Sequence, residues 1–193
     1  MFSGIIRKTT EIIAHEEKND SLFLTFKKPE NWVIGLGDSI ATNGTCLTVA
    51  TMDDDSYATE LMPETLAKTT FGKKIPRQVN LEKSLTLADA VDGHLVTGHV
   101  DTLGTVQDII EQGNTNVLRM SFSPEFSHLI AEKGSITVNG VSLTVIEVGD
   151  DFFTVSLVDY TWQNTTLHEL EKGSLVNLEF DILAKYIARM TEK

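Results

Sequence analysis

Hydrophobic and polar residues alternate with a period of two along much of the chain. The alternation is clearest at residues 142–148 (SLTVIEV) and 153–157 (FTVSL), and this period is that of half-buried β-strands. Turn signals such as Asn43-Gly44 and Asn139-Gly140 separate the runs. Many short strands with little helix favour small closed antiparallel barrels, because closure leaves no strand edge exposed.

Two segments have helical spacing instead. Residues 85–91 (LTLADAV) are expected to form a helix-like connector in the middle of the chain. At residues 181–190 (DILAKYIARM), the apolar positions 182, 183, 186, 187 and 190 share one face of a helix. That face needs a partner, which is either a barrel of the same chain or another subunit. Asp181 precedes this helix and is a candidate for its N-cap.

The chain is a tandem repeat. Residues 39–49 (SIATNGTCLTV) match residues 135–145 (SITVNGVSLTV) at seven of eleven positions with an offset of 96, and residues 79–82 (VNLE) recur at 176–179. A period this long does not suit a solenoid unit, but it suits a complete small domain. We therefore expect one domain at residues 1–94, a second at 95–185, and the end of a C-terminal helix at 186–193.

Composition and charge restrict the class of protein. The chain has 193 residues, 41% hydrophobic and 23% charged, so a soluble globular protein is expected. Sixteen Lys and Arg against 28 Asp and Glu give a net charge of −12, which disfavours nucleic acid as a partner. No secretory segment or membrane-spanning run is evident, so no membrane contact and a cytoplasmic location are expected. The single cysteine, Cys46, excludes an intrachain disulfide and a cysteine zinc cluster.

Four motifs occur together and in order: the opening MFxGI, the duplicated SIxxNGx[CS]LTV, the block GHLVTGHVD at residues 93–101, and VNLExDILxKY at 176–186. In this combination the chain resembles the riboflavin synthases of the alpha-chain type over essentially its whole length. The resemblance implies an all-β fold, a tandem duplication of two small six-stranded Greek-key β-barrels plus a C-terminal helix that assembles a homotrimer. It also implies that each barrel binds one lumazine.

The resemblance implies a transferase of riboflavin biosynthesis with no metal and no organic cofactor. Two molecules of 6,7-dimethyl-8-ribityllumazine dismutate by four-carbon transfer to give riboflavin and 5-amino-6-ribitylamino-pyrimidinedione. The family also raises association with a lumazine synthase capsid as a partner interaction. The alternative is a non-catalytic lumazine- or flavin-binding protein of the fluorescent antenna type, which would be expected to lose the catalytic groups.

One substrate donates carbon and the other accepts it, so catalytic groups are expected where the two copies differ. The aligned differences include Cys46 opposite Ser142, His99 opposite Ile5, and Lys133 opposite Gly37. The retention of such groups favours the enzyme over the antenna.

The family match implies a role for each candidate catalytic residue. Cys46 would assist attack at the lumazine C7 carbon, or Ser39 would orient a nucleophilic water there; the two alternatives stay open. His99 would move a proton of the C7 methyl group, and Lys133 would stabilise the resulting anion. His94 lies five residues before His99, so strand alternation would place it on the opposite face, and a structural role is expected.

The family match also implies substrate contacts at corresponding places in both halves. The first site is expected to use Phe2, Gly4, Ile5, Ile6, Cys46, Leu47, Thr48, Glu60, Leu61, Met62, Pro63, Glu64 and Thr65. The second is expected to use Gly98, Val100, Ser142, Leu143, Thr144, Ser156, Leu157, Val158, Asp159, Tyr160 and Thr161, with Asp181 as either a ligand contact or the helix cap. The sequence departs from the family pattern at Asp159, where proline is usual, and at Thr10 and Asp92, where glycine is common. Asp159 could change the shape of the second pocket.

Overall fold

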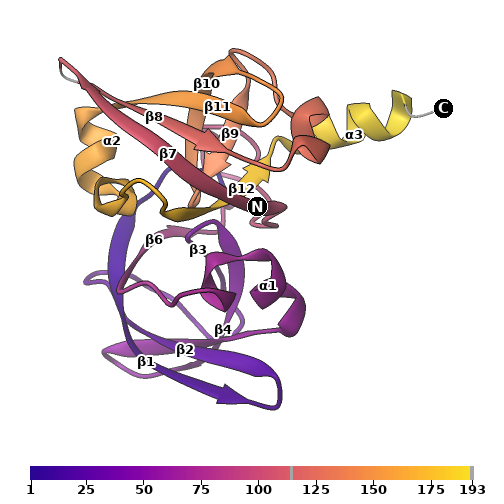
Figure 1. Cartoon of the computed structure of the whole chain (residues 1–193). Helices are drawn as coiled ribbons and strands as arrows, with labels where there is room; N and C mark the ends of the chain where they lie inside the picture. The colour runs from indigo at the N-terminus through magenta and orange to yellow at the C-terminus, as the bar shows by residue number, and fades with distance from the viewer. Residues whose placement is uncertain (114, 192–193) are drawn as a thin grey trace.

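The computed structural model describes residues 1–113 and 115–191, and these residues form two closed β-barrels, one stacked on the other (Figure 1). The strands of the first barrel are β1 (Lys8–Lys18), β2 (Ser21–Lys27), β3 (Ser39–Thr42), β4 (Thr45–Met52), β5 (Ser56–Leu61) and β6 (Gln78–Lys83). Those of the second are β7 (Thr102–Gln112), β8 (Thr115–Ser121), β9 (Ser135–Val138), β10 (Val141–Val148), β11 (Phe152–Val158) and β12 (Leu175–Phe180).

The strands close in the orders β1-β2-β5-β4-β3-β6 and β10-β11-β8-β7-β12-β9, and their pairings are antiparallel. Short helices lie between strands: α1 (Pro63–Lys68), η1 (Thr70–Gly72), η2 (Pro124–Leu129), α2 (Asp159–Asn164) and η3 (Thr166–Glu169), with α3 (Ile182–Thr191) at the end. The predicted all-β fold with two six-stranded barrels and a terminal helix is therefore confirmed.

Buried and exposed residues alternate along the strands, so the apolar positions of the sequence pattern face the core of each barrel. In β4, Leu47 and Val49 are buried while Thr48 between them is exposed, and the same pattern recurs at Leu143, Thr144 and Val145 of β10. Each barrel encloses its own apolar core, so the two halves are packed as two domains. The outward-facing residues of β4 and β10 are thus available for binding.

The two barrels meet at the turns that carry the repeated Asn-Gly dipeptides. The side-chain amide of Asn80 donates to the Asn139 carbonyl at 2.9 Å, and that of Asn177 donates to the Asn43 carbonyl at 2.8 Å. A Cβ on Gly44 would lie 2.7 Å from the backbone nitrogen of Gly140. Only glycine permits this approach, and the reciprocal amide contacts fix the barrels relative to each other.

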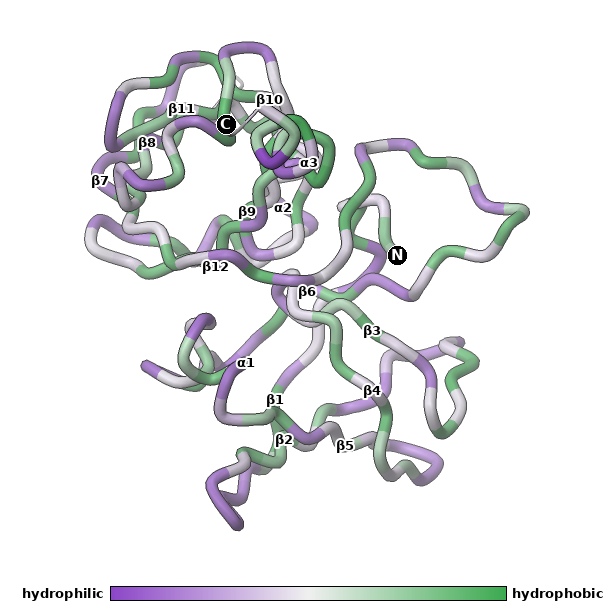
Figure 2. The backbone as a smooth tube through the Cα atoms, turned by 90° about the vertical axis from the view of Figure 1, so that its right-hand side faces the viewer, coloured by the Kyte–Doolittle hydropathy of each residue, from purple (hydrophilic) through white to green (hydrophobic). Residues whose placement is uncertain are grey.

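The connector between the barrels is not helical, so the prediction for residues 85–91 is wrong. Residues 84–93 form an extended excursion with turns, which Figure 2 shows as the loop that leaves the barrels beside the N-terminus. Leu87 is fully exposed, so the apolar spacing finds no surface to pack against. In addition, the Asp89 carboxylate accepts hydrogen bonds from the backbone N–H and the hydroxyl of Thr86, both at 2.7 Å, and such local bonds favour a turn over a helix.

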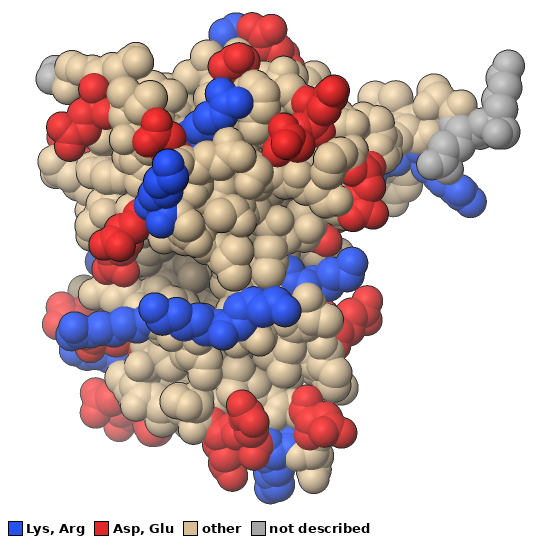
Figure 3. Space-filling view, in the orientation of Figure 1, with Lys and Arg blue, Asp and Glu red and all other residues tan. Residues whose placement is uncertain are grey.

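The C-terminal helix α3 begins where the sequence predicts. The carboxylate of Asp181 accepts a hydrogen bond from the backbone N–H of Leu183 at 2.9 Å, so its role as N-cap is confirmed. The helix projects from the second barrel and contacts it at η2 and through the ion pair of Lys185 with Asp101, at 2.6 Å (Figures 1 and 3). Its apolar residues Leu183, Tyr186, Ile187 and Met190 are more than half exposed. Residues 192 and 193 of the predicted terminal segment lie outside the described residues.

Over the part of the chain that the structure describes, no helix has the length and apolar character needed to cross a bilayer. The domain boundaries predicted at residues 94 and 185 stay predictions, since the region between β6 and β7 contributes to both barrels.

Candidate functional site

Two short segments cross from one half of the chain to the barrel of the other half. The carbonyl of Gly4 accepts a hydrogen bond from the Ser142 N–H at 2.8 Å, and the carbonyl of Gly98 accepts one from the Cys46 N–H at 2.8 Å. Both glycines have φ near +79°, at +78° and +79°, and a Cβ on either would lie 2.6 Å from the Cβ of its partner residue. Ile6 packs against the core of the second barrel.

These contacts correct the predicted grouping of the substrate residues. Gly4 and Ile6 lie against the second barrel and Gly98 against the first, so the prediction that these residues lie at the site of their own half is wrong. Sequence alignment identifies equivalent segments, but it does not tell which barrel a connecting segment touches. Phe2 does lie at the first site, where it packs with Ala41, Val96 and Cys46.

A buried glutamate holds each crossing segment. The Glu82 carboxylate accepts hydrogen bonds from the N–H and hydroxyl of Ser3 and the N–H of Gly4, at 2.7, 2.6 and 2.9 Å. Glu179 repeats the arrangement with Thr97 and Gly98, at 2.6, 2.7 and 3.0 Å. Burial raises the pKa of both carboxyl groups, and the hydrogen bonds from the segments oppose that rise. Both glutamates lie at VNLE positions, but their hydrogen-bond partners are not predictable from the motif.

The first site brings together Ser39, Cys46 and His99. Ser39 pairs across strands with Thr48, and Cys46 is the next outward-facing residue of β4. The hydrogen bond from Cys46 to Gly98 places His99 beside this strand, with its side chain exposed. Three of the four predicted catalytic residues therefore lie on one face of the first barrel.

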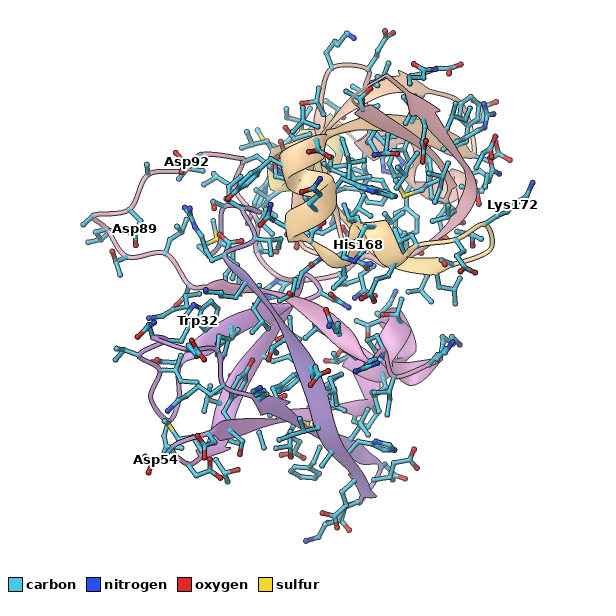
Figure 4. The ribbon with its side chains drawn as sticks, turned by 90° about the vertical axis from the view of Figure 1, so that its left-hand side faces the viewer. Trp32, Asp54, Asp89, Asp92, His168 and Lys172 are labelled. Atoms are coloured by element: carbon cyan, nitrogen blue, oxygen red, sulfur yellow. The ribbon has the colours of Figure 1, made fainter. Side chains whose placement is uncertain are left out.

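A hollow of about 530 Å³ opens beside Ser39. Trp32 lines it from the first barrel, while Asp89 and Asp92 line it from the connector; Figure 4 shows the connector with its two aspartates lying above Trp32. Asp92 also forms an exposed 3.5 Å ion pair with Arg7. Asp92, one of the departures from the family pattern, thus helps to enclose this hollow.

The second site is built on β10 and the segment that follows β11. Ser142 and Thr144 face outward from β10, and Lys133 lies in the turn before β9, where its N–H donates to the Val145 carbonyl at 2.9 Å. Lys133 has φ of +64°, while its counterpart Gly37 has φ of +85°. Lys133 therefore belongs to the second barrel, apart from the other three predicted catalytic residues.

The predicted substrate residues divide into two groups by orientation. The side chains of Leu47, Leu61, Leu143 and Leu157 lie in the barrel cores, so only their backbone groups can face a ligand. The side chains of the following residues are exposed: Thr48, Glu60, Met62, Pro63, Glu64, Thr144, Ser156, Val158, Asp159 and Tyr160. The following residues are half-buried: Ile5, Thr65, Val100, Ser142 and Thr161.

Two departures from the family pattern have local structural roles. Asp159 opens α2 as Pro63 opens α1, and its carboxylate accepts hydrogen bonds from the Gln163 amide at 2.9 and 3.0 Å. It therefore preserves the start of a helix at the rim of the second site. The hydroxyl of Thr10 donates to the Lys27 carbonyl at 2.6 Å, away from both sites.

His94 is placed differently from the expectation. Residues 93–95 are not in a strand, so the alternation that put His94 opposite His99 does not apply. Its imidazole lies in the second site, where Nδ1 is 2.7 Å from the Ser142 hydroxyl. Alignment of the copies pairs Ala41 with Thr137 and Cys46 with Ser142 at the offset of 96, but it does not show that His94 contacts the second copy.

Comparisons with known proteins agree with this geometry. The family model described as the lumazine binding domain matches residues 3–84 and again 97–181. Riboflavin synthase of Actinobacillus pleuropneumoniae is 37% identical over 195 residues, covering 100% of this chain and 91% of that protein. Riboflavin synthase of Mycobacterium tuberculosis is 39% identical over 196 residues, covering 98% of each chain.

Solved structures with the same fold include complexes of LumP. LumP complexed with riboflavin superposes with a TM-score of 0.86 at 25% identity, and LumP complexed with 6,7-dimethyl-8-(1'-D-ribityl) lumazine with a TM-score of 0.84 at 25% identity. Each comparison covers 93% of this chain and 99% of the other.

Proposed function

Because the chain belongs to the riboflavin synthase family and carries the lumazine-binding domain twice, we propose that it makes riboflavin from two molecules of 6,7-dimethyl-8-ribityllumazine. One molecule gives up a four-carbon unit and leaves as 5-amino-6-ribitylamino-pyrimidinedione, and the other accepts the unit and becomes riboflavin. The observation that carries this proposal is the pair of equivalent sites, each formed by one outward-facing strand and one glycine of a crossing segment. A reaction between two copies of one molecule needs two such sites.

The differences between the sites support distinct roles for them. His99, at the first site, takes a proton from the C7 methyl group of one lumazine. At the same site, either the Cys46 side chain or a water held by Ser39 acts at C7. Lys133, on the second barrel, stabilises the anion that the proton loss creates. Holding both substrates in a reactive orientation contributes about 7–11 kcal/mol to lowering the barrier.

The proposed chemistry needs groups from both barrels at one pair of substrates, so a first barrel and a second barrel have to face each other. We propose a homotrimer in which the first barrel of one subunit faces the second barrel of its neighbour. The exposed apolar face of α3 supports this assembly, because an exposed stripe of large apolar side chains is typical of an interface. We also propose a cytoplasmic location and an association with lumazine synthase, both of which follow from the family resemblance.

The purified protein tests the proposal directly. Incubation with 6,7-dimethyl-8-ribityllumazine should produce riboflavin, followed by absorbance, and sedimentation should give three chains per particle. The second candidate function is the non-catalytic antenna, which the LumP complexes favour by their TM-scores. Tight lumazine binding without riboflavin formation would support the antenna and overturn the enzyme.

A further inference from the structure

A chain of three polar side chains crosses the back of the second site. Nδ1 of His94 lies 2.7 Å from the Ser142 hydroxyl, and Nε2 lies 3.2 Å from the Thr137 hydroxyl. The backbone N–H of His94 donates to the Ser3 carbonyl at 3.1 Å, which fixes the ring at this position. A Cβ on Gly93 would lie 2.9 Å from the Ser142 hydroxyl oxygen, so the connector passes directly against Ser142.

The first site lacks this arrangement. The residues equivalent to Thr137 and Ser142 are Ala41 and Cys46, which pack in an apolar cluster with Phe2 and Val96. Both polar partners of His94 are therefore replaced together in the other copy. The lining of the first site is apolar at the place where the second site carries hydrogen-bonding groups.

The hydrogen bonds can run in only one favourable direction. Burial lowers the pKa of His94, and the negative charge of Asp181 opposes this shift without cancelling it. The imidazole is therefore neutral and has one donor and one acceptor nitrogen. Thr137 is 1% exposed and has no other side-chain partner among the described residues. Its hydroxyl therefore donates to Nε2, since the reverse would leave a buried O–H without an acceptor. Nδ1–H then donates to Ser142, whose own hydroxyl hydrogen is free to point into the site.

We propose that His94 is a positioning residue that turns the Ser142 hydroxyl towards a lumazine acceptor atom, with Thr137 selecting the tautomer of the imidazole. This proposal rests on the proposed function only for the identity of the ligand. It makes Ser142 of the second site a hydrogen-bond donor to the pteridine at the place where the first site has Cys46, whose thiol is only a weak donor. The two sites thereby hold the same molecule differently, as a donor and an acceptor of carbon require.

The test compares four variants with the full-length protein: Thr137→Ala, Thr137→Ser, His94→Gln and Thr137→Ala/His94→Gln. Thr10→Ala is the matched control, because it also removes a buried threonine hydroxyl with one hydrogen bond, but in β1 of the first barrel. Riboflavin formation and fluorescence titration with 6,7-dimethyl-8-ribityllumazine are measured for each. Circular dichroism and thermal unfolding report whether each variant is folded.

We expect Thr137→Ala and His94→Gln each to lower kcat about five- to tenfold. Each should also lower the affinity for lumazine at one of the two sites by a similar factor, because one neutral hydrogen bond is lost. Thr137→Ser should restore both, and the double variant should lose no more than either single variant, because the two residues act through one hydroxyl. Thr10→Ala should match the unsubstituted protein.

Unchanged turnover and affinity in both single variants would overturn the proposal, as would losses that simply add in the double variant. A protein that binds lumazine but makes no riboflavin would contradict the proposed function alone. In that case the titration still decides the role of His94, through the weakening of one site and its rescue by Thr137→Ser.

Discussion

The first barrel buries hydroxyl groups at positions where the second barrel has apolar side chains. Among the described residues, four buried side-chain oxygens have no hydrogen-bond partner, and they belong to Thr42, Thr45, Tyr57 and Thr59. The equivalent residues at the offset of 96 are Val138, Val141, Phe153 and Val155, which are buried and apolar. The second copy therefore shows which side chain fits each position without a hydroxyl.

Removing one such hydroxyl should stabilise the protein. A buried hydroxyl without a partner costs about 1–3 kcal/mol, so Tyr57→Phe and Thr59→Val should each raise the free energy of unfolding by about 1 kcal/mol. Phenylalanine keeps the stacking of ring 57 on Phe26, whose centroid lies 5.1 Å away. Thr42 and Thr45 face each other across β3 and β4, so their substitutions by valine need not add.

Urea unfolding of each variant measures the effect, and a gain of about 1 kcal/mol corresponds to a rise in Tm of about 2–4 °C for a chain of this size. The reverse substitution Val155→Thr should destabilise the second barrel by about 1–3 kcal/mol. A loss of stability in Tyr57→Phe or Thr59→Val would refute the reasoning, because it would mean that the hydroxyl is hydrogen-bonded in the folded protein.

Three further predictions follow from the site. Lys133→Gly should raise the free energy of unfolding by about 0.5–1 kcal/mol, because the φ of +64° at position 133 suits glycine, the residue at the equivalent position 37. The same variant should form riboflavin more slowly, and a drop in its stability would exclude backbone strain at Lys133. Burial raises the pKa of Glu179, so the folded state binds its proton more readily and stability should fall as pH rises through that raised pKa. Denaturation at a series of pH values should show a shallower fall in Glu179→Gln, and an unchanged slope would contradict this. His99→Ala should lower turnover about a hundredfold or more with lumazine affinity mostly retained, and unchanged turnover would remove His99 from proton transfer.

The repeat and the alternation of residues predicted most of the fold. The offset of 96 identified two copies, and the outward position of Thr48 and Thr144 followed from the alternation within β4 and β10. The cap at Asp181 was also predictable, because an N-cap depends on residues within one turn of the helix. Such features are local or repeated, so the sequence shows them directly.

The features that the sequence did not reveal depend on contacts between distant residues. Gly4 meets Ser142 and Gly98 meets Cys46 because each segment crosses to the other barrel, and alignment of the copies carries no information about that crossing. The place of His94 depends on the same crossing. The connector was predicted wrongly for a different reason. Apolar spacing such as that around Leu87 predicts a helix only where a surface is present to bury the apolar side chains.

Equilibrium titration of the assembled protein with 6,7-dimethyl-8-ribityllumazine tests the central claim most directly, because that claim is one ligand site on each barrel. We predict two lumazine molecules bound per chain, with different affinities. Saturation at one molecule per chain would contradict the account.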